Sequence, residues 1–364
     1  MKALLILANG IVFEGQSLGE VGTTIGEVVF NTAMAGYEET LTDPSYYGQI
    51  ITQTYPLVGN YGITGEDAES ERIWAFGYIV REACNSPSNW RSQKTLDTYL
   101  KEQKIIGISG IDTRSLTRIL RESGVVNGAI TTEYSTKEQA LADEKLMNLI
   151  RQFSVVNAVS SVTTDSIKVF NDNGKYNIAL YDYGAKNNII RNLVKRDCRV
   201  SVLPASTSAN ELVALKPDGI MLSNGPGDPA ENVEIIKELA FIAKLNIPIF
   251  GICLGHQLMA LATGAKTVKL KYGHRGVNQP VTDFAHDRTY ITSQNHGYAV
   301  LGDTVNEDIA KISHINANDK TVEGIRYKNM PCFTVQFHPE ASGGPRDTEY
   351  LFDEFIELVK GAKN

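Results

Sequence analysis

The sequence predicts an α/β protein of two domains: a C-terminal domain built on a parallel sheet, preceded by a β-rich α+β domain. The first observation is length, because 364 residues suit two domains of roughly 100–200 residues each. The second is that, after residue 175, short apolar runs alternate with amphipathic stretches, as in βαβ units. The third is that strand-like runs and turn residues dominate the earlier part. We therefore expect domains at 1–170 and 171–364, joined at the polar, turn-rich segment 171–175.

Composition and charge exclude several classes of protein. Apolar residues make up 42% and charged residues 21% of the chain, so a packed core is expected. The net charge of −7, without a long basic block, disfavours nucleic acid or an anionic membrane as a partner. Four cysteines without close pairs or metal-ligand spacing exclude a disulfide scaffold and a zinc ribbon, and predict a reducing cytoplasm. The apolar runs at 1–8 and 245–265 are interrupted by turn residues, so neither a signal peptide nor a membrane helix is predicted.

The elements expected in the N-terminal domain are mostly strands. They are a hairpin around Asn9-Gly10, strands at 26–30, 49–54 and 76–80, a helix at 113–122, and a second helix running from a capping box at Thr136 towards Phe153.

In the C-terminal domain, strands and helices alternate. Strands are predicted at 178–181, 200–203, 219–222 and 247–250, and helices at 187–195, 209–215 and 231–245. In parallel sheets, ligands bind at the carboxyl ends of the strands. The loops that follow these strands are therefore the candidate site.

One such loop carries a candidate nucleophile. The strand ending at Phe250 runs into Gly251-Ile252-Cys253-Leu254-Gly255, followed by a helical pattern. This is a cysteine version of the G-x-S-x-G elbow, in which small residues permit a sharp turn that exposes the nucleophile. The N-terminus of a helix lowers the pKa of a thiol and stabilises an oxyanion. A buried structural cysteine is the competing interpretation, and the pentapeptide alone leaves both open.

A thiol nucleophile needs a base, and all six histidines lie after residue 255. A predicted strand at 333–337 ends in His338-Pro339-Glu340, where the carboxylate can reach an imidazole nitrogen. His338 by itself would be an ordinary loop histidine. Together with Glu340 at a strand end, it becomes a candidate base with its orienting group.

Three further polar segments attract attention. Asn224-Gly225-Pro226-Gly227-Asp228-Pro229 follows a predicted strand, and its fixed backbone can approach a ligand closely. Gly273-His274-Arg275-Gly276 and Asn295-His296-Gly297-Tyr298 are expected to be polar loops between strands. Each segment, taken alone, is explained more simply by a structural role.

Taken together, the motifs around Cys253, His338 and Gly225 resemble those of the class I (triad) glutamine amidotransferases. The first half is similar to the small subunits of carbamoyl-phosphate synthetase, through the segments 26–37, 42–46, 55–60 and 110–114, which include Gly36-Tyr37 and Asp43-Pro44-Ser45. The segments 273–276 and 294–300 continue this resemblance. It covers nearly the whole chain and is weakest at about 135–175.

The resemblance implies roles for individual residues. Cys253 would be the nucleophile, His338 the general base and acid, and Glu340 its orienter. Backbone N–H groups of Leu254 and Gly227 would form the oxyanion hole. The glutamine pocket would be lined by Ser45, Gly225, Gly227, Leu254, Gln257, Asn295, Gly297 and Tyr298. Tyr298 departs from the phenylalanine common at this position, so its backbone is the expected contact.

The resemblance also implies a reaction and a partner. The chain would hydrolyse glutamine through a thioester and deliver ammonia to a large subunit that makes carbamoyl phosphate from bicarbonate and ATP. No G-x-x-x-x-G-K-[ST] phosphate loop occurs, so ATP and Mg would be used by the large subunit, and this chain is expected to carry no cofactor or metal. The N-terminal domain would dock on the large subunit in a heterodimer or an assembly of heterodimers. Arginine and pyrimidine biosynthesis both remain open as destinations.

Three alternatives differ in class. A non-catalytic regulatory subunit with a glutaminase fold is disfavoured, because Cys253, His338 and Glu340 are all present. The glutaminase component of another amidotransferase is disfavoured by the N-terminal half. A free-standing cysteine peptidase is the third, and a glutaminase assay with and without the large subunit distinguishes all of them.

Overall fold

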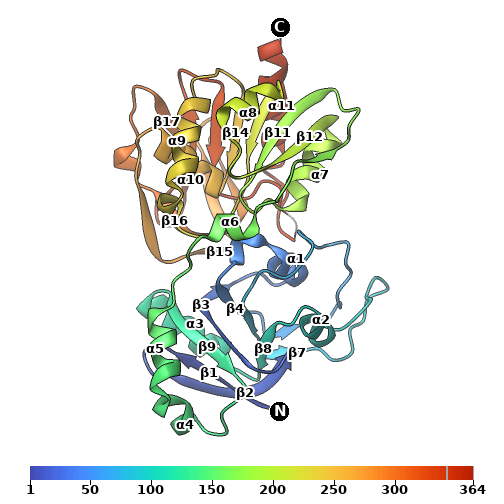
Figure 1. Ribbon diagram of the computed structural model, residues 1–364, viewed down its shortest axis with the longest axis vertical. Helices are drawn as coiled ribbons and strands as arrows, with labels where there is room; N and C mark the ends of the chain where they lie inside the picture. Colours follow the sequence, from blue (N-terminus) through green and yellow to red (C-terminus); the bar gives the residue numbers. More distant parts are fainter. Residues whose placement is uncertain (342, 364) are drawn as a thin grey trace. The chain divides into compact units, whose positions relative to one another are not determined.

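The computed structural model describes residues 1–341 and 343–363, which form two compact units (Figure 1). The first is Met1–Val156, and the second begins at Asn157. The predicted junction at 171–175 lies inside the second unit. There β10 (Lys168–Phe170) pairs antiparallel with β12 (Cys198–Pro204), so the polar residues after it form a turn between two strands of one sheet.

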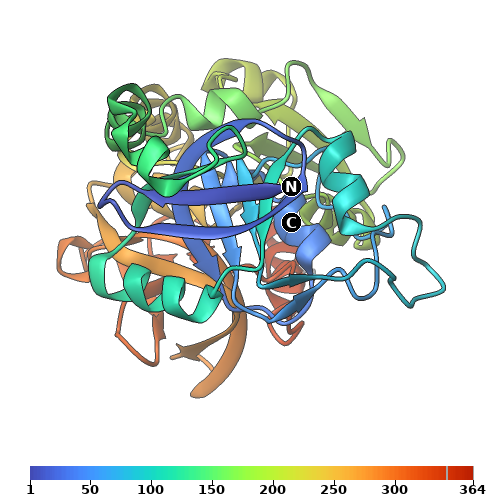
Figure 2. The same cartoon turned by 90° about the horizontal axis from the view of Figure 1, so that it is seen from below.

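The first unit is built on a closed barrel with the strand order β1-β2-β8-β6-β4-β3-β9. Its strands are β1 (Lys2–Leu7), β2 (Val12–Gly19), β3 (Thr23–Asn31), β4 (Gln49–Gln53), β6 (Gly77–Ile79), β8 (Ile106–Ser109) and β9 (Val126–Thr131). The run β3-β4-β6-β8 is parallel, and the other neighbours are antiparallel. Figure 2 looks onto the β1–β2 hairpin, drawn in dark blue. As predicted, Asn9-Gly10 makes its turn, with Ile6 opposite Val12 and Gly10 at φ 87°.

Helices and short elements complete this unit. They are α1 (Tyr37–Thr42), η1 (Pro44–Tyr46), α2 (Leu96–Glu102), α3 (Thr113–Ser123), α4 (Lys137–Ala142), α5 (Glu144–Gln152) and the strand pair β5 (Leu57–Val58) and β7 (Glu82–Ala83). Thr136 caps α4 as predicted, but the single helix expected up to Phe153 is wrong. Asp143 ends α4 and accepts a hydrogen bond from the Leu146 N–H, so a new helix starts there.

The second unit is built on a ten-stranded sheet with the order β10-β12-β11-β13-β14-β19-β18-β17-β15-β16. The remaining strands are β11 (Tyr176–Asp182), β13 (Gly219–Leu222), β14 (Ile249–Ile252), β15 (Thr267–Asp283), β16 (Arg288–Val300), β17 (Ala310–Asn316), β18 (Val322–Tyr327) and β19 (Cys332–Val335). The neighbours β12, β11, β13, β14 and β19 are parallel, which confirms the predicted βαβ units. The pairs outside this parallel core are antiparallel.

Helices cover both faces of the parallel strands (Figure 1). They are α7 (Asn187–Lys195), α8 (Ala209–Ala214), α9 (Val233–Ile242), α10 (Leu254–Ala262) and α11 (Tyr350–Lys363), with the shorter α6 (Ala158–Val162), η2 (Pro229–Glu231) and η3 (Gly302–Thr304). Ile220 and Leu222 pack in the cluster with α8, α9 and α10, whereas Met221 packs in the cluster with α7 and α11. Successive residues of a strand face opposite sides, which explains the continuous apolar run at 219–222. Among the helices in the described part of the chain, none combines the length and apolar character needed to cross a membrane.

Two segments expected to be loops are instead paired strand residues. His274, Arg275 and Gly276 of β15 lie opposite His296, Asn295 and Gln294 of β16, with a register shift on either side. The prediction failed because these polar side chains are buried inside the sheet, where hydropathy does not indicate a strand.

Candidate active site

Cys253 lies at a sharp turn between β14 and α10. Its backbone has φ 52° and ψ −101°, a conformation that costs free energy for any residue other than glycine. The flanking glycines are required by close packing. A Cβ on Gly251 would lie 2.8 Å from Thr334 Cγ2, and one on Gly255 would lie 2.4 Å from the Leu222 carbonyl oxygen. The structure thus has the strained strand-to-helix turn that the G-x-C-x-G pattern predicts.

The Cys253 thiol is buried at the N-terminus of α10 and lies 3.8 Å from the Asn295 carbonyl oxygen. Its own backbone N–H donates to the Val335 carbonyl oxygen at 2.8 Å. This bond ties the turn to the end of β19, the strand that leads to His338. The neighbouring parallel strands β14 and β19 therefore hold Cys253 close to the segment that contains His338 and Glu340.

His338 and Glu340 form a buried pair. His338 Nδ1 lies 2.6 Å from Glu340 Oε1, while Nε2 has no hydrogen-bond partner among the described residues. The same carboxylate oxygen lies 3.0 Å from Lys186 Nζ. A carboxylate on one ring nitrogen fixes the orientation of the imidazole and leaves the other nitrogen for proton transfer.

The charges around Glu340 favour its ionised form. Burial alone would raise its pKa, but Lys186 and His338 outweigh burial and lower the pKa to about 2. For His338, burial and Lys186 lower the pKa, whereas Glu340 and Cys253 raise it, and the net direction is upward. The site therefore stabilises a protonated imidazole beside an ionised carboxylate, which is the state that follows when His338 takes a proton.

Lys186 is the residue that sequence reasoning missed. It lies in the loop after β11 and precedes α7, and its backbone N–H donates to Asn224 Oδ1 at 3.2 Å. Two residues later, Asn188 Nδ2 donates to the backbone carbonyl of Glu340. Its position could have identified it, because ligands bind at the loops that follow parallel strands and Lys186 is the one cation in the loop after β11.

The Gly225–Gly227 loop packs tightly on its surroundings. A Cβ on Gly225 would lie 2.2 Å from the Tyr183 carbonyl oxygen and 2.7 Å from Leu254 Cδ2, so the loop lies against the first residue of α10. Gly227 has φ 87°, and its Cβ would lie 2.7 Å from Ala158 Cβ. Both glycines are therefore needed for this backbone path.

Other residues predicted for the glutamine pocket surround α10. Gln257 Nε2 donates to the Tyr298 carbonyl oxygen at 2.8 Å and to Gln336 Oε1 at 2.9 Å, which joins α10 to β16 and to the residue that follows β19. A Cβ on Gly297 would lie 3.2 Å from Arg275 Nη2. The structure thus brings Gln257 to Tyr298 and Cys253 to Asn295.

Ser45 belongs to the first unit, whereas the residues above belong to the second. It is buried in η1, and its backbone N–H donates to Asp43 Oδ1 at 2.9 Å. Its place in a glutamine pocket stays a prediction.

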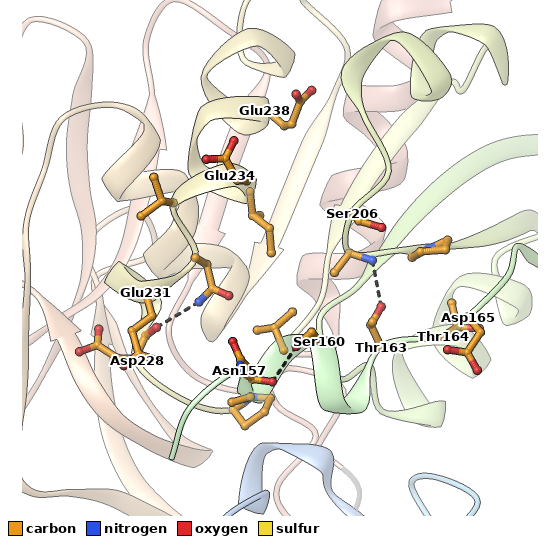
Figure 3. A pocket seen from close by; sticks show the side chains of 18 residues that line it. Asn157, Ser160, Thr163, Thr164, Asp165, Ser206, Asp228, Glu231, Glu234 and Glu238 are labelled. Atoms are coloured by element: carbon orange, nitrogen blue, oxygen red, sulfur yellow. Dashed lines mark hydrogen bonds between the residues drawn. The ribbon is translucent and has the colours of Figure 1, made fainter. Parts of the chain in front are cut away.

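A cavity of about 770 Å³ lies beside the loop after β13, between α6 and α9 (Figure 3). Pro226 and Asp228 contribute to its wall. Its ionisable lining residues are all carboxylates: Asp165, Asp228, Glu231, Glu234 and Glu238. Cys253 and His338 do not line it, so this cavity is distinct from the space around the thiol.

Two families of known proteins match the chain. The glutamine amidotransferase class-I family matches residues 179–358, and the carbamoyl-phosphate synthase small chain, CPSase domain, matches residues 5–130. The first match contains Cys253, His338, Glu340 and Lys186, while the second contains Ser45.

Similar proteins extend over the whole chain. The carbamoyl phosphate synthase small chain of Clostridium perfringens (strain 13 / Type A) is 51% identical over 359 residues, covering 99% of this chain and 100% of that one. The small chain of Listeria monocytogenes serotype 4b (strain F2365) is 51% identical over 360 residues, covering 99% and 97%. The pyrimidine-specific small chain of Bacillus subtilis (strain 168) is 49% identical over 360 residues, covering 99% and 96%. With half of its residues shared along its full length, and with a buried Cys-His-Glu constellation in its second unit, the chain belongs to the carbamoyl phosphate synthase small-chain family.

Proposed function

We propose that this chain is the glutaminase subunit of a carbamoyl-phosphate synthase. It hydrolyses glutamine at Cys253 and delivers ammonia to a large subunit that makes carbamoyl phosphate from bicarbonate and ATP. Membership of the small-chain family supports this function. The observation that carries it is the buried His338 imidazole, which is held by Glu340 on Nδ1 and is close enough to the Cys253 thiol, at its strained turn, for the thiol to raise its pKa.

In the first half of the reaction, His338 accepts the thiol proton of Cys253, and the thiolate attacks the side-chain amide carbon of glutamine. The tetrahedral oxyanion is stabilised by the backbone N–H groups of Leu254, at the N-terminus of α10, and of Gly227. His338 then gives its proton to the departing nitrogen. The carbon–nitrogen bond breaks, ammonia leaves, and a thioester remains on Cys253.

In the second half, His338 takes a proton from water, and the resulting hydroxide attacks the thioester carbon. Collapse of this second intermediate releases glutamate and returns the proton to the Cys253 sulfur. Glu340 stays ionised throughout, because Lys186 and His338 lower its pKa to about 2. Its role is to hold Nδ1 of the imidazole, so that Nε2 faces the reacting atoms.

We propose that several residues of the second unit, together with Ser45, form the glutamine pocket. The proposed lining residues are Ser45, Gly225, Gly227, Leu254, Gln257, Asn295, Gly297 and Tyr298. Gln257 acts mainly by positioning, because its amide nitrogen is already bonded to the Tyr298 carbonyl and to Gln336. The backbone of Tyr298, held in this way by α10, is the part expected to contact glutamine.

The partner, cofactors and compartment complete the proposal. The large subunit forms a heterodimer with this chain, or an assembly of heterodimers, and uses the ATP and Mg. The glutaminase chemistry uses a cysteine and a histidine and needs no cofactor. All four cysteines are free thiols, which suits a cytoplasmic enzyme. The carbamoyl phosphate supplies arginine or pyrimidine biosynthesis, and the Bacillus subtilis relative has a pyrimidine-specific name.

A glutaminase assay with and without a large subunit tests this function. Ammonia in bulk water near neutral pH is mostly protonated and no longer nucleophilic, so hydrolysis without an acceptor wastes glutamine. We expect slow glutamate release from the chain alone and faster release with large subunit, bicarbonate and ATP. Absence of glutamate release under both conditions would favour the non-catalytic regulatory alternative.

A further inference from the structure

Two histidines and a glutamate from three different strands meet inside the second unit. They are His274 of β15, His296 of β16 and Glu323 of β18, and all three are buried. One ligating atom from each lies within 4.8 Å of the other two. We propose that this cluster binds one divalent transition-metal ion, with zinc as the best fit. None of these three residues belongs to the catalytic constellation, and the proposal does not depend on the proposed function.

Both imidazoles are oriented by a hydrogen-bond partner on one ring nitrogen. His274 Nε2 lies 2.8 Å from Asp319 Oδ2, and its Nδ1 has no hydrogen-bond partner among the described residues. His296 Nδ1 lies 2.7 Å from the Tyr298 carbonyl oxygen, so Nδ1 is the protonated nitrogen and Nε2 carries a lone pair. A carboxylate or a carbonyl behind the imidazole is the usual arrangement for a metal-binding histidine.

The third ligand is a carboxylate with an open oxygen. Glu323 is fully buried; its Oε1 accepts from Asn316 Nδ2 at 3.2 Å, while Oε2 has no partner in the described part of the chain. A buried carboxylate is costly unless a cation or hydrogen bonds compensate it. Two histidines and a glutamate suit zinc, which binds nitrogen and oxygen ligands at about 2.0–2.2 Å. At such bond lengths ligand atoms lie roughly 3.4 Å apart in a tetrahedron, so small side-chain rotations would close the site.

An ion pair is the competing explanation, with a protonated His274 between two carboxylates. Burial lowers the pKa of His274, but Glu323 and Asp319 outweigh burial and raise it. This pairing accounts for His274, yet its Nδ1 lies 3.6 Å from Glu323 Oε1, beyond a hydrogen bond. The ion pair also does not explain His296. Its Nε2 lies 3.0 Å from Gln294 Oε1, and because Nδ1 carries the proton, both of these atoms are hydrogen-bond acceptors. Rotation of the Gln294 amide would satisfy His296 alone, whereas a metal ion satisfies all three side chains.

The charged groups near the cluster include both carboxylates that favour a bound cation and positive groups that oppose it. Arg275 is close enough to contribute to the lowered pKa of His296, and its positive charge opposes a metal. Glu323 and Asp319 bring two negative charges to the cluster, while Arg275 and His338 bring positive charge that opposes a cation.

The site would fix a segment next to the thiol. His296 directly follows Asn295, whose carbonyl oxygen lies 3.8 Å from Cys253 Sγ. Because the three ligands come from three strands, a bound ion would join β15, β16 and β18 and so hold Asn295 and His296 in place. The role is structural, and no step of glutamine hydrolysis passes through the ion.

The test uses the full chain with Cys253→Ala, so that the thiol and His338 do not supply a second zinc site. The protein is freed of metal with a chelator, mixed with Zn²⁺, desalted, and analysed for metal content and thermal unfolding. We expect one zinc per chain and a higher Tm with zinc. Adding Glu323→Gln or His274→Asn should remove the retained zinc and the Tm shift. Asp319→Asn, which removes the group that orients His274, should weaken zinc binding about 10–100-fold.

The matched control is His286→Asn, which removes a half-exposed imidazole outside the cluster and should keep the zinc. Cobalt gives a second readout that does not depend on stability. The Cys253→Ala chain should show the visible d–d bands of a nitrogen- and oxygen-ligated Co²⁺, and Glu323→Gln should abolish them. Failure to retain zinc in the Cys253→Ala chain, or equal retention after Glu323→Gln and His274→Asn, would overturn the proposal. The readout is metal binding in an inactive variant, so it stays independent of glutaminase activity.

Discussion

A single carboxylate oxygen of Glu340 holds both His338 and Lys186. The sequence motif predicted the first contact, because His338 and Glu340 are two residues apart. It did not predict the second, because Lys186 comes from a distant loop and only the parallel sheet brings the two together. At the scale of single residues, the contact between His338 and Glu340 could therefore be predicted from the sequence, whereas the ion pair of Lys186 with Glu340 could not.

Lys186→Met should destabilise the protein. Removing one partner from a buried ion pair leaves an uncompensated charge, which typically costs about 3–5 kcal/mol. His338 remains beside Glu340, so we expect the lower end of that range in urea unfolding at neutral pH. The control is Lys195→Met, whose ammonium pairs with Glu349 at the surface, 2.8 Å away. Exposed pairs contribute about 0–1 kcal/mol, so equal losses from the two variants would refute the structural role of Lys186.

The decrease in the free energy of unfolding at acid pH should depend on Glu340. Its pKa falls from 4.5 to about 2 on folding, so between these values the unfolded chain binds more protons than the folded one. The free energy of unfolding contributed by this group is complete above about pH 4.5 and is lost as pH falls towards 2. Glu340→Gln should therefore flatten the pH dependence of unfolding in that window. An unchanged slope would show that Glu340 does not stay ionised in the folded protein.

At the scale of elements, the elbow depends on how closely α10 approaches the sheet. Gly255→Ala would place a methyl group 2.4 Å from the Leu222 carbonyl oxygen, so the helix must move away from β13. Overpacking of this kind typically costs about 1–3 kcal/mol. We expect a lower Tm together with a loss of glutaminase activity, measured by thermal unfolding and glutamate release.

A matched glycine lies in α11. A Cβ on Gly361 would meet nothing within 4 Å, so Gly361→Ala should keep full activity and be neutral or slightly stabilising. If Gly255→Ala behaved in the same way, close packing would not be what shapes the elbow.

The elements that the sequence predicted well are those with a clear hydrophobic pattern. The strand at 219–222 and the helix at 187–195 match β13 and α7, because an apolar run and a 3.6-residue period mark them directly. The long β15–β16 hairpin was missed where His274 and His296 are buried as polar cross-strand neighbours. Their burial is stabilised by partners far away in the sequence, which no local pattern records.

At the scale of the whole molecule, the first unit contributes one proposed pocket residue, Ser45, and none of the three catalytic residues. The second unit, from Asn157 on, contains Cys253, His338 and Glu340, and we propose that Met1–Val156 docks on the large subunit.

The sequence placed the junction at 170, and the structure moves it because β10 pairs with β12. A chain starting at Tyr176 would leave that edge of β12 unpaired, which favours aggregation.

A chain starting at Asn157 should fold yet fail to form a stable complex with the large subunit. Coupling between the subunits would be a free-energy link, typically about 1–3 kcal/mol. We therefore expect the truncated chain to elute apart from the large subunit in gel filtration and to show no acceleration by ATP and bicarbonate. Normal co-elution with full acceleration would contradict a docking role for the first unit.

In the proposed reaction, Cys253 serves only to release ammonia from glutamine. The direct test is carbamoyl-phosphate synthesis by the assembled complex carrying Cys253→Ala, measured once with glutamine and once with ammonium as the nitrogen source. Cys84→Ala, which removes a thiol of the first unit, serves as the matched control. We expect Cys253→Ala to abolish glutamine-dependent synthesis and to leave ammonium-dependent synthesis intact. Equal loss of both activities in a complex that still assembles, or full glutamine-dependent synthesis without the thiol, would contradict it.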